Sequence, residues 1–137
     1  MFVAHISLVV RDYDEAIAFY VGRLGFDLIE DTAQPEQDKR WVTIRPPGAG
    51  PQATTILLAR AATPEQAARV GDQTGGRVGF FLATDDFDRD HARFTAAGVT
   101  WVRPPVDQPY GRVAVFADLY GNLWDLIQVA DRAPGLS

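Results

Sequence analysis

Residues 2–12 read FVAHISLVVRD, and residues 77–86 read RVGFFLATDD. Both are apolar runs rich in strand-forming residues that end in an acidic residue, a pattern typical of a strand followed by the N-cap of a helix. Apolar residues then recur at helical spacing in both places, and a glycine, Gly25 or Gly98, follows the last of them. These two glycines are 73 residues apart, so the sequence indicates that one structural unit occurs twice.

Three extended runs follow each expected helix. In the first half they begin at Phe26, Trp41 and Thr54, and in the second half they read VTWVRPP, VAVFAD and LWDLIQV. Both halves therefore follow the order β-α-β-β-β. This matching order predicts an α+β protein built from two tandem βαβββ modules.

The boundary between the modules is expected in a polar, Gly-rich stretch. Thr63 followed by Pro64 is typical of the start of a short helix, and the chain up to Gly76 is rich in turn-forming residues. The sequence therefore predicts module one over residues 1–60, a linker over 61–76 and module two over 77–137, all within a single domain.

One helix per module can cover only one face of a four-stranded sheet, so the other face needs a partner. Two such sheets that curl toward each other would form a half-barrel with a U-shaped cleft, a typical place for a small ligand. Alternation along the first strand directs Ile6, Leu8 and Val10 toward the helix, and His5, Ser7 and Val9 toward the cleft.

Composition excludes several classes of function. The chain has 13 Lys and Arg against 18 Asp and Glu, a formal charge of -5, which disfavours nucleic acid and anionic membranes as partners. It contains no Cys, and therefore no disulfides, thiolate metal sites or Cys nucleophiles. No apolar run approaches the roughly 20 residues of a membrane span, and no signal peptide is evident. We therefore expect a cytoplasmic protein.

The sequence resembles the vicinal oxygen chelate superfamily, which includes lactoylglutathione lyase (glyoxalase I), extradiol dioxygenases and bleomycin-resistance proteins. The segments that carry this resemblance are HISLVVRD (5–12), AIAFY (16–20), LGF (24–26), FADLYGN (116–122) and LWDL (123–126). The turn Asp118-Leu119-Tyr120-Gly121 departs from the usual Asp-Pro-Asp-Gly but keeps its glycine. The resemblance implies a glyoxalase-like fold, a small-molecule ligand in the cleft and a homodimer, with the modules paired within one chain or swapped between two.

In metal-dependent members, the first and last strands of each module supply His or Glu ligands. The resemblance carries these positions to His5, Ile56, Arg77 and Asp125. Ile56 has no donor atom, Arg77 is always cationic, and a catalytic zinc generally has three protein ligands. We therefore expect no cofactor; the alternative is Zn, Ni or Fe at the incomplete pair His5 and Asp125. An extradiol dioxygenase is disfavoured because the second histidine, His91, falls within a helix.

The same positions suggest chemistry without a metal. His5 would act as a base oriented by Asp125, and Arg77 would stabilise an enolate, as in an isomerase or lyase acting beside a carbonyl. The alternative is a purely structural role, in which a salt bridge between Arg77 and Asp125 holds the two sheets together.

A third hypothesis is binding without catalysis, as in the bleomycin-resistance relatives, which sequester a ligand. The ligand contacts expected from cleft-facing positions and from the loop at 108–112 are Ser7, Trp41, Ile56, Phe81, Tyr110 and Arg112. Core packing is the alternative for the rings, above all Phe81 and Trp101. The sequence therefore predicts a glyoxalase/bleomycin-resistance-like small-molecule binder. It leaves open catalysis, a metal-dependent lactoylglutathione lyase-like activity and a protein without a ligand.

Overall fold

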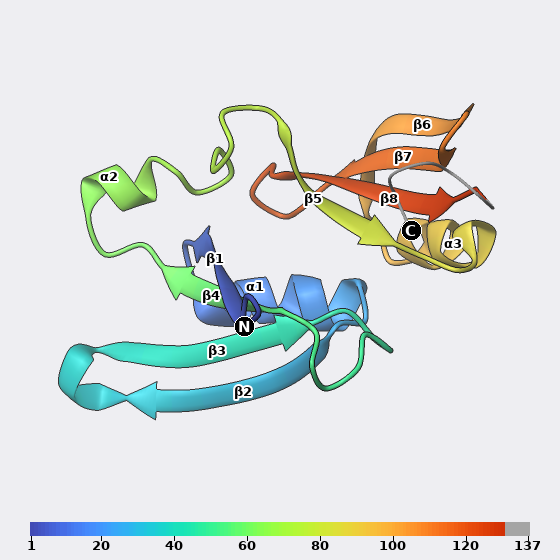
Figure 1. Ribbon diagram of the computed structural model, residues 1–137. Coiled ribbons are helices and arrows are strands. Elements are labelled where there is room, and N and C mark those ends of the chain that lie inside the picture. Colours follow the sequence, from blue (N-terminus) through green and yellow to red (C-terminus); the bar gives the residue numbers. More distant parts are fainter. Residues whose placement is uncertain (131–137) are drawn as a thin grey trace. The chain divides into compact units, whose positions relative to one another are not determined.

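The computed structural model describes residues 1–130, which form two compact units, Met1–Gln73 and the part that begins at Thr74 (Figure 1). The last seven residues assigned to module two, 131–137, lie outside the described residues. Each unit contains one four-stranded mixed sheet. The cleft expected between the modules stays a prediction.

The first unit is a sheet with the order β1-β4-β3-β2. Its elements, in chain order, are β1 (His5–Val10), α1 (Tyr13–Ile17), the π-helical turn η1 (Ala18–Arg23), β2 (Asp27–Gln34), the 3-10 turn η2 (Pro35–Gln37), β3 (Lys39–Arg45), β4 (Thr55–Arg60) and α2 (Pro64–Ala67). The strands β1 and β4 are parallel, and the other pairs are antiparallel.

The second unit repeats this arrangement with the order β5-β8-β7-β6. Its elements are β5 (Val78–Ala83), α3 (Phe87–Ala96), β6 (Thr100–Gln108), β7 (Gly111–Ala117) and β8 (Leu123–Val129). The pair β5 and β8 is parallel, as β1 and β4 are in the first unit. The α+β fold with two tandem βαβββ modules is therefore confirmed.

The helix boundaries follow the short-range signals in the sequence. Asp12 caps α1 by accepting a hydrogen bond from the Glu15 amide, and Asp86 caps α3 in the same way. Gly25 and Gly98 have φ angles of +76° and +83°, which favour glycine and end both helical segments.

Two strands are longer than the sequence indicated. β2 runs to Gln34 because it pairs with β3 along its whole length. β6 runs to Gln108 through Pro104 and Pro105. The sheet tolerates these prolines because β6 is an edge strand and its register shifts between Arg103 and Val106.

Alternation along β1 separates two faces of the first sheet. Leu8 and Val10 are fully buried, together with Leu58 and Val42 from neighbouring strands. Ile6 shares this face but is 44% exposed at the beginning of the strand. We call the other side the His5 face; it carries His5, Ser7, Thr55, Leu57, Trp41 and Thr43.

The segment expected as a linker is tied to the first unit. The side-chain amide of Gln73 accepts a hydrogen bond from the Val9 amide and donates one to the Ser7 carbonyl, both at 2.8 Å. Because β1 is an edge strand, Gln73 occupies backbone groups that an added strand would otherwise use.

Candidate functional site

His5 is held at the beginning of β1 by two neighbours. Its Nδ1 atom is hydrogen-bonded to the hydroxyl of Thr55, its register partner on β4. Thr55 in turn donates to the Ala4 carbonyl at 3.3 Å, so its oxygen accepts the hydrogen bond from Nδ1–H of His5. The ring also meets Trp41 edge-on, with centroids 5.4 Å apart. This arrangement leaves Nε2 of neutral His5 as the unprotonated, basic nitrogen.

The structure places Thr55, not Ile56, beside His5. Ile56 pairs with Ile6 and Ile44 on the opposite face of the sheet, where it is 6% exposed. The expected position of Ile56 near His5 is therefore off by one residue, and a one-residue change along a strand exchanges faces. Ser7 lies on the His5 face next to Leu57.

A pocket of about 510 Å³ opens in the first unit and is bounded partly by the His5 face. Val9, Leu57 and Ala59 supply apolar surface, and the half-buried Trp41 supplies a ring. The size and the mixed lining are those of a small-molecule site. The lining contains Lys39, Arg40 and Arg60 but no Asp or Glu.

The Tyr13 ring contacts two of these cations, Arg40 and Arg60. The guanidinium carbons of Arg40 and Arg60 lie 5.2 and 5.1 Å from the centroid of its ring, within the range of cation–π contacts. Arg40 also binds Asp31 at 2.7 Å and Asp14 at 2.9 Å. Hydrogen bonding to Arg40 lowers the pKa of Asp31 below its ordinary value. Arg40 is therefore already neutralised by two carboxylates.

Asp125 lies in the middle of β8, opposite Phe81 on β5 and Val115 on β7. Burial raises the pKa of its carboxyl above the ordinary value, and the charge of Arg103 partly counteracts this shift. Phe81 is 68% exposed, so it is not part of the core packing.

Arg77 is placed differently from expectation. It is exposed just before β5, and its carbonyl accepts a hydrogen bond from the Thr74 hydroxyl at 2.5 Å. Within residues 74–130, no ion pair joins Arg77 to Asp125, and the cation that acts on this carboxyl is Arg103. The salt bridge expected between Arg77 and Asp125 is therefore not observed. His5 belongs to the other unit, so its predicted cooperation with Asp125 stays a prediction.

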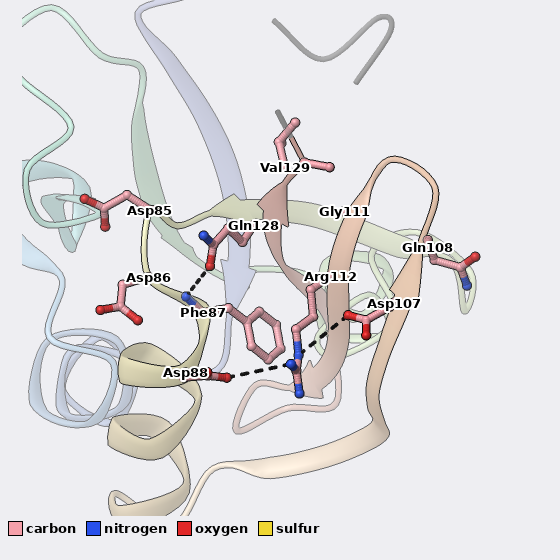
Figure 2. Close-up of a pocket in the computed structure, with 11 residues that line it drawn as sticks. Asp85, Asp86, Phe87, Asp88, Asp107, Gln108, Gly111, Arg112, Gln128 and Val129 are labelled. Atoms are coloured by element: carbon pink, nitrogen blue, oxygen red, sulfur yellow. Dashed lines mark hydrogen bonds and ion pairs between the residues drawn. The ribbon is translucent and has the colours of Figure 1, made fainter. Parts of the chain in front are cut away.

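Figure 2 shows a second hollow, of about 640 Å³, beside the N-terminus of α3. Arg112 lies over the Phe87 ring at 5.2 Å and is 4.0 Å from the carboxylates of Asp88 and Asp107. Asp85 and Asp86 also line this hollow but lie on the side away from Arg112 (Figure 2). Arg112 is thus occupied by its own neighbours within the described chain.

Tyr110 lies in the turn between β6 and β7 and is 40% exposed. The turn is held close to β8 because the Tyr110 carbonyl accepts from the Ala130 amide at 2.9 Å. Gly111 has a φ of +151°, and a Cβ there would meet the Gln128 carbonyl at 2.3 Å. Any larger residue at Gly111 would therefore displace this part of the turn.

His91 and Trp101 belong to the core side of the second sheet. Their rings stack with centroids 4.2 Å apart, and His91 also stacks on Phe87. The indole nitrogen of Trp101 donates to the Thr95 hydroxyl at 2.9 Å. Both residues therefore have packing roles.

The residues do not fit the metal site of the superfamily. His5 is adjacent to Thr55, a weak neutral donor, and Ile56 faces the other side. In the part of the chain that the structure describes, no three His, Cys, Asp or Glu side chains gather into a group that could hold a metal ion.

Three residues that contact the candidate sites were not among the site residues expected from the sequence: Thr55, Arg60 and Arg103. Thr55 and Arg103 become neighbours of His5 and Asp125 only through strand register. For the pocket of the first unit the sequence did contain a signal, because Lys39 is the only lysine of an acidic chain. No helix in residues 1–130 is long and apolar enough to cross a membrane.

The chain belongs to the Glyoxalase/Bleomycin resistance protein/Dioxygenase superfamily, whose family model matches residues 2–126. An uncharacterized protein of Shewanella frigidimarina (strain NCIMB 400) is 61% identical over 132 residues, which cover 96% of each chain. The solved structure of UcmS2 has 31% identity and a TM-score of 0.78 and covers 93% of this chain and 97% of its own. TnmS3, an antibiotic binding protein from Streptomyces sp. CB03234, has 34% identity and a TM-score of 0.75, with coverage of 95% and 97%.

Proposed function

We propose that this protein binds a small organic molecule of the antibiotic type and retains it without changing it chemically. The observation that carries this proposal is the pocket of about 510 Å³ in the first unit, with its apolar surface and charged rim. The similarity to TnmS3, an antibiotic binding protein, supports the same class of ligand. A homodimeric state and a cytoplasmic location, which the sequence led us to expect, are part of this proposal.

The test is protection of a susceptible bacterium that expresses the protein. We expect a higher inhibitory concentration of an aromatic antibiotic, either the anionic nalidixic acid or the cationic daunorubicin, and mass spectrometry should recover the bound compound unchanged. Leu57→Arg, which fills the pocket, should abolish protection. Leu28→Arg is the matched control, because Leu28 is 43% exposed and does not line the pocket. Equal sensitivity with and without the protein for both antibiotics, together with no retention in equilibrium dialysis, would contradict the proposal.

A second candidate is proton transfer beside a carbonyl without a metal. The specific observation in its favour is the contact of His5 with Thr55, which leaves Nε2 free to accept a proton. In this proposal Thr55 would orient the base through Nδ1, the role expected of Asp125, and Arg77 would stabilise the enolate. The assay is deuterium incorporation beside the carbonyl of hydroxyacetone in D2O. Exchange that persists in EDTA and is lost in His5→Gln would support this chemistry, and exchange unchanged in His5→Gln would exclude His5 as the base.

A further inference from the structure

We propose that the pocket of the first unit selects an aromatic ligand that carries a carboxylate, bound with its ring on the apolar surface and its charge at Lys39 and Arg60. This inference rests on the proposed binding function and adds the class of ligand. The geometry points to it through three independent features of the pocket: its charge, the state of its cations and the position of its ring.

The charge of the lining is opposite to that of the chain. The protein carries a formal charge of -5, yet three cations and no carboxylate line this pocket. The hollow in the second unit is lined by four Asp and a single Arg, so the contrast is specific to the first unit. Because Arg40 is paired with Asp31 and Asp14, Lys39 and Arg60 supply the positive charge that attracts an anionic ligand and disfavours a cationic one.

The three cations differ in their availability. Arg40 is engaged by Asp31 and Asp14. The carboxylate nearest to Arg60 belongs to Asp38, whose side chain is fully exposed and lies 3.6 Å away, an arrangement of little energetic value. Lys39 forms no ion pair within residues 1–130. An incoming carboxylate can therefore bind Lys39 and Arg60 without breaking a strong internal pair.

The apolar part of the pocket suits a planar ring. Val9, Leu57 and Ala59 supply aliphatic surface from two adjacent strands, and Trp41 adds an aromatic ring. His5 contacts the Trp41 ring edge-on, with an interplanar angle of 84°, and so restricts its orientation. An aromatic ligand would thus lie against an ordered ring and aliphatic side chains on one face of the sheet.

The arginine at the rim is also preorganised. Arg60 lies over the Tyr13 ring and donates to the backbone carbonyl of Asp38 at 2.5 Å, so its guanidinium is held in place before a ligand arrives. Binding then requires less loss of side-chain freedom than binding to a mobile arginine. Lys39, in contrast, is exposed and can adjust to the position of the carboxylate.

The experiment compares two probes of matched size and opposite charge, 2-naphthoate and naphthalen-2-ylmethylammonium. Reductive methylation with 13C-formaldehyde labels Lys39, because it is the only lysine, together with the terminal amine. We expect 2-naphthoate to shift the Lys39 methyl resonance and leave that of the terminal amine unchanged. Calorimetry on unlabelled protein should show binding of 2-naphthoate and no measurable binding of the ammonium probe.

Substitutions then locate the charge contact. Arg60→Gln and Lys39→Gln should each weaken 2-naphthoate binding by about tenfold, as expected for loss of one charge-assisted contact. Arg23→Gln removes an equal charge from an exposed position outside the pocket and should change the affinity by less than about twofold. Circular dichroism confirms that the variants fold.

The failure of this inference is distinguishable from failure of the binding function. Equal or tighter binding of the ammonium probe, lost in Leu57→Arg, would overturn the ligand class while binding in the pocket stands. Binding of 2-naphthoate that is unchanged in both Arg60→Gln and Lys39→Gln would overturn the charge contact. Absence of binding by either probe would overturn the aromatic carboxylate, whereas the binding function is judged separately by the antibiotic assay.

Discussion

The imidazole of His5 and the hydroxyl of Thr55 are joined by a hydrogen bond between parallel neighbouring strands. Since Thr55 donates to the Ala4 carbonyl, His5 must supply the proton from Nδ1. This contact selects the tautomer of neutral His5 and leaves Nε2 without the proton.

Thr55→Val should therefore change the tautomer of His5. Without an acceptor at Nδ1, the proton should move in part to Nε2, and 15N NMR of the neutral imidazole should record the shift of both ring nitrogens. Thr54→Val is the control, since Thr54 donates to the Val3 carbonyl at 2.6 Å and is not bonded to His5. Identical 15N shifts in Thr55→Val and the parent protein would refute the assigned hydrogen bond.

Asp125→Asn should stabilise the protein at neutral pH. Burial raises the pKa of Asp125, so the folded state holds this proton more tightly than the unfolded state does. That advantage is complete below the unfolded-state pKa and is lost as the pH rises through the folded-state pKa, above which a partly buried charge remains. Calorimetric melting between about pH 3 and pH 8 should show a higher Tm for Asp125→Asn at the upper end.

The control for this prediction is Asp107→Asn, because the Asp107 side chain is 84% exposed. It should leave the pH dependence nearly unchanged. Arg103→Gln should raise the pKa of Asp125 further, since the charge of Arg103 lowers it. A fall in Tm for Asp125→Asn at neutral pH would mean that the carboxylate has a strong cationic partner.

Asp90→Asn should have the opposite effect. Asp90 accepts hydrogen bonds from Arg89 at 3.0 Å and from the Thr84 hydroxyl at 2.5 Å, and the bond from Arg89 is the main cause of its lowered pKa. Its contribution to stability is present above the unfolded-state pKa and is lost as the pH falls through the lower folded-state pKa. The variant should therefore be less stable at pH 7, with a difference that shrinks below about pH 4.

Asp72→Asn, at an exposed position, should show no such pH-dependent difference. Chemical denaturation at several pH values measures both variants. A loss of stability in Asp90→Asn that is constant down to about pH 2 would show that the charge of Asp90 is unimportant.

Asp118→Ala should be one of the more damaging changes. Asp118 is 6% exposed and accepts hydrogen bonds of 2.9 Å from the amides of Tyr120 and Asn122 and from the Asn122 side chain. Loss of a buried acceptor leaves these donors unsatisfied, and we expect about 2–4 kcal/mol less unfolding free energy in urea. Asp118→Asn keeps one acceptor oxygen and should lose less, so equal losses in the two variants would argue against this role.

Protein purified without an affinity tag should contain far less than one equivalent of Zn, Ni or Fe. The reason is chemical, because Thr55, the register partner of His5, is a weak donor and Ile56 has no donor atom and faces the other side of the sheet. Elemental analysis provides the measurement. One metal per chain that survives dialysis would restore the alternative of a lactoylglutathione lyase-like enzyme.

The repeated modules could be predicted because their signals are local. Asp12 and Asp86 cap helices through the next turn of the chain, and Gly25 and Gly98 end helical segments through their own φ angles. The site was harder to predict. Ile56 was expected beside His5, whereas the register brings Thr55 there.

The sequence by itself determined the order of elements, the duplication and the family, because capping, turn chemistry and strand alternation act over a few residues. Only the tertiary structure decided which side chains become neighbours. Arg103, not Arg77, acts on Asp125, and Lys39 and Arg60 line one pocket. The physical reason is that strand pairing joins distant segments, and a shift of one residue moves a side chain to the other face of the sheet.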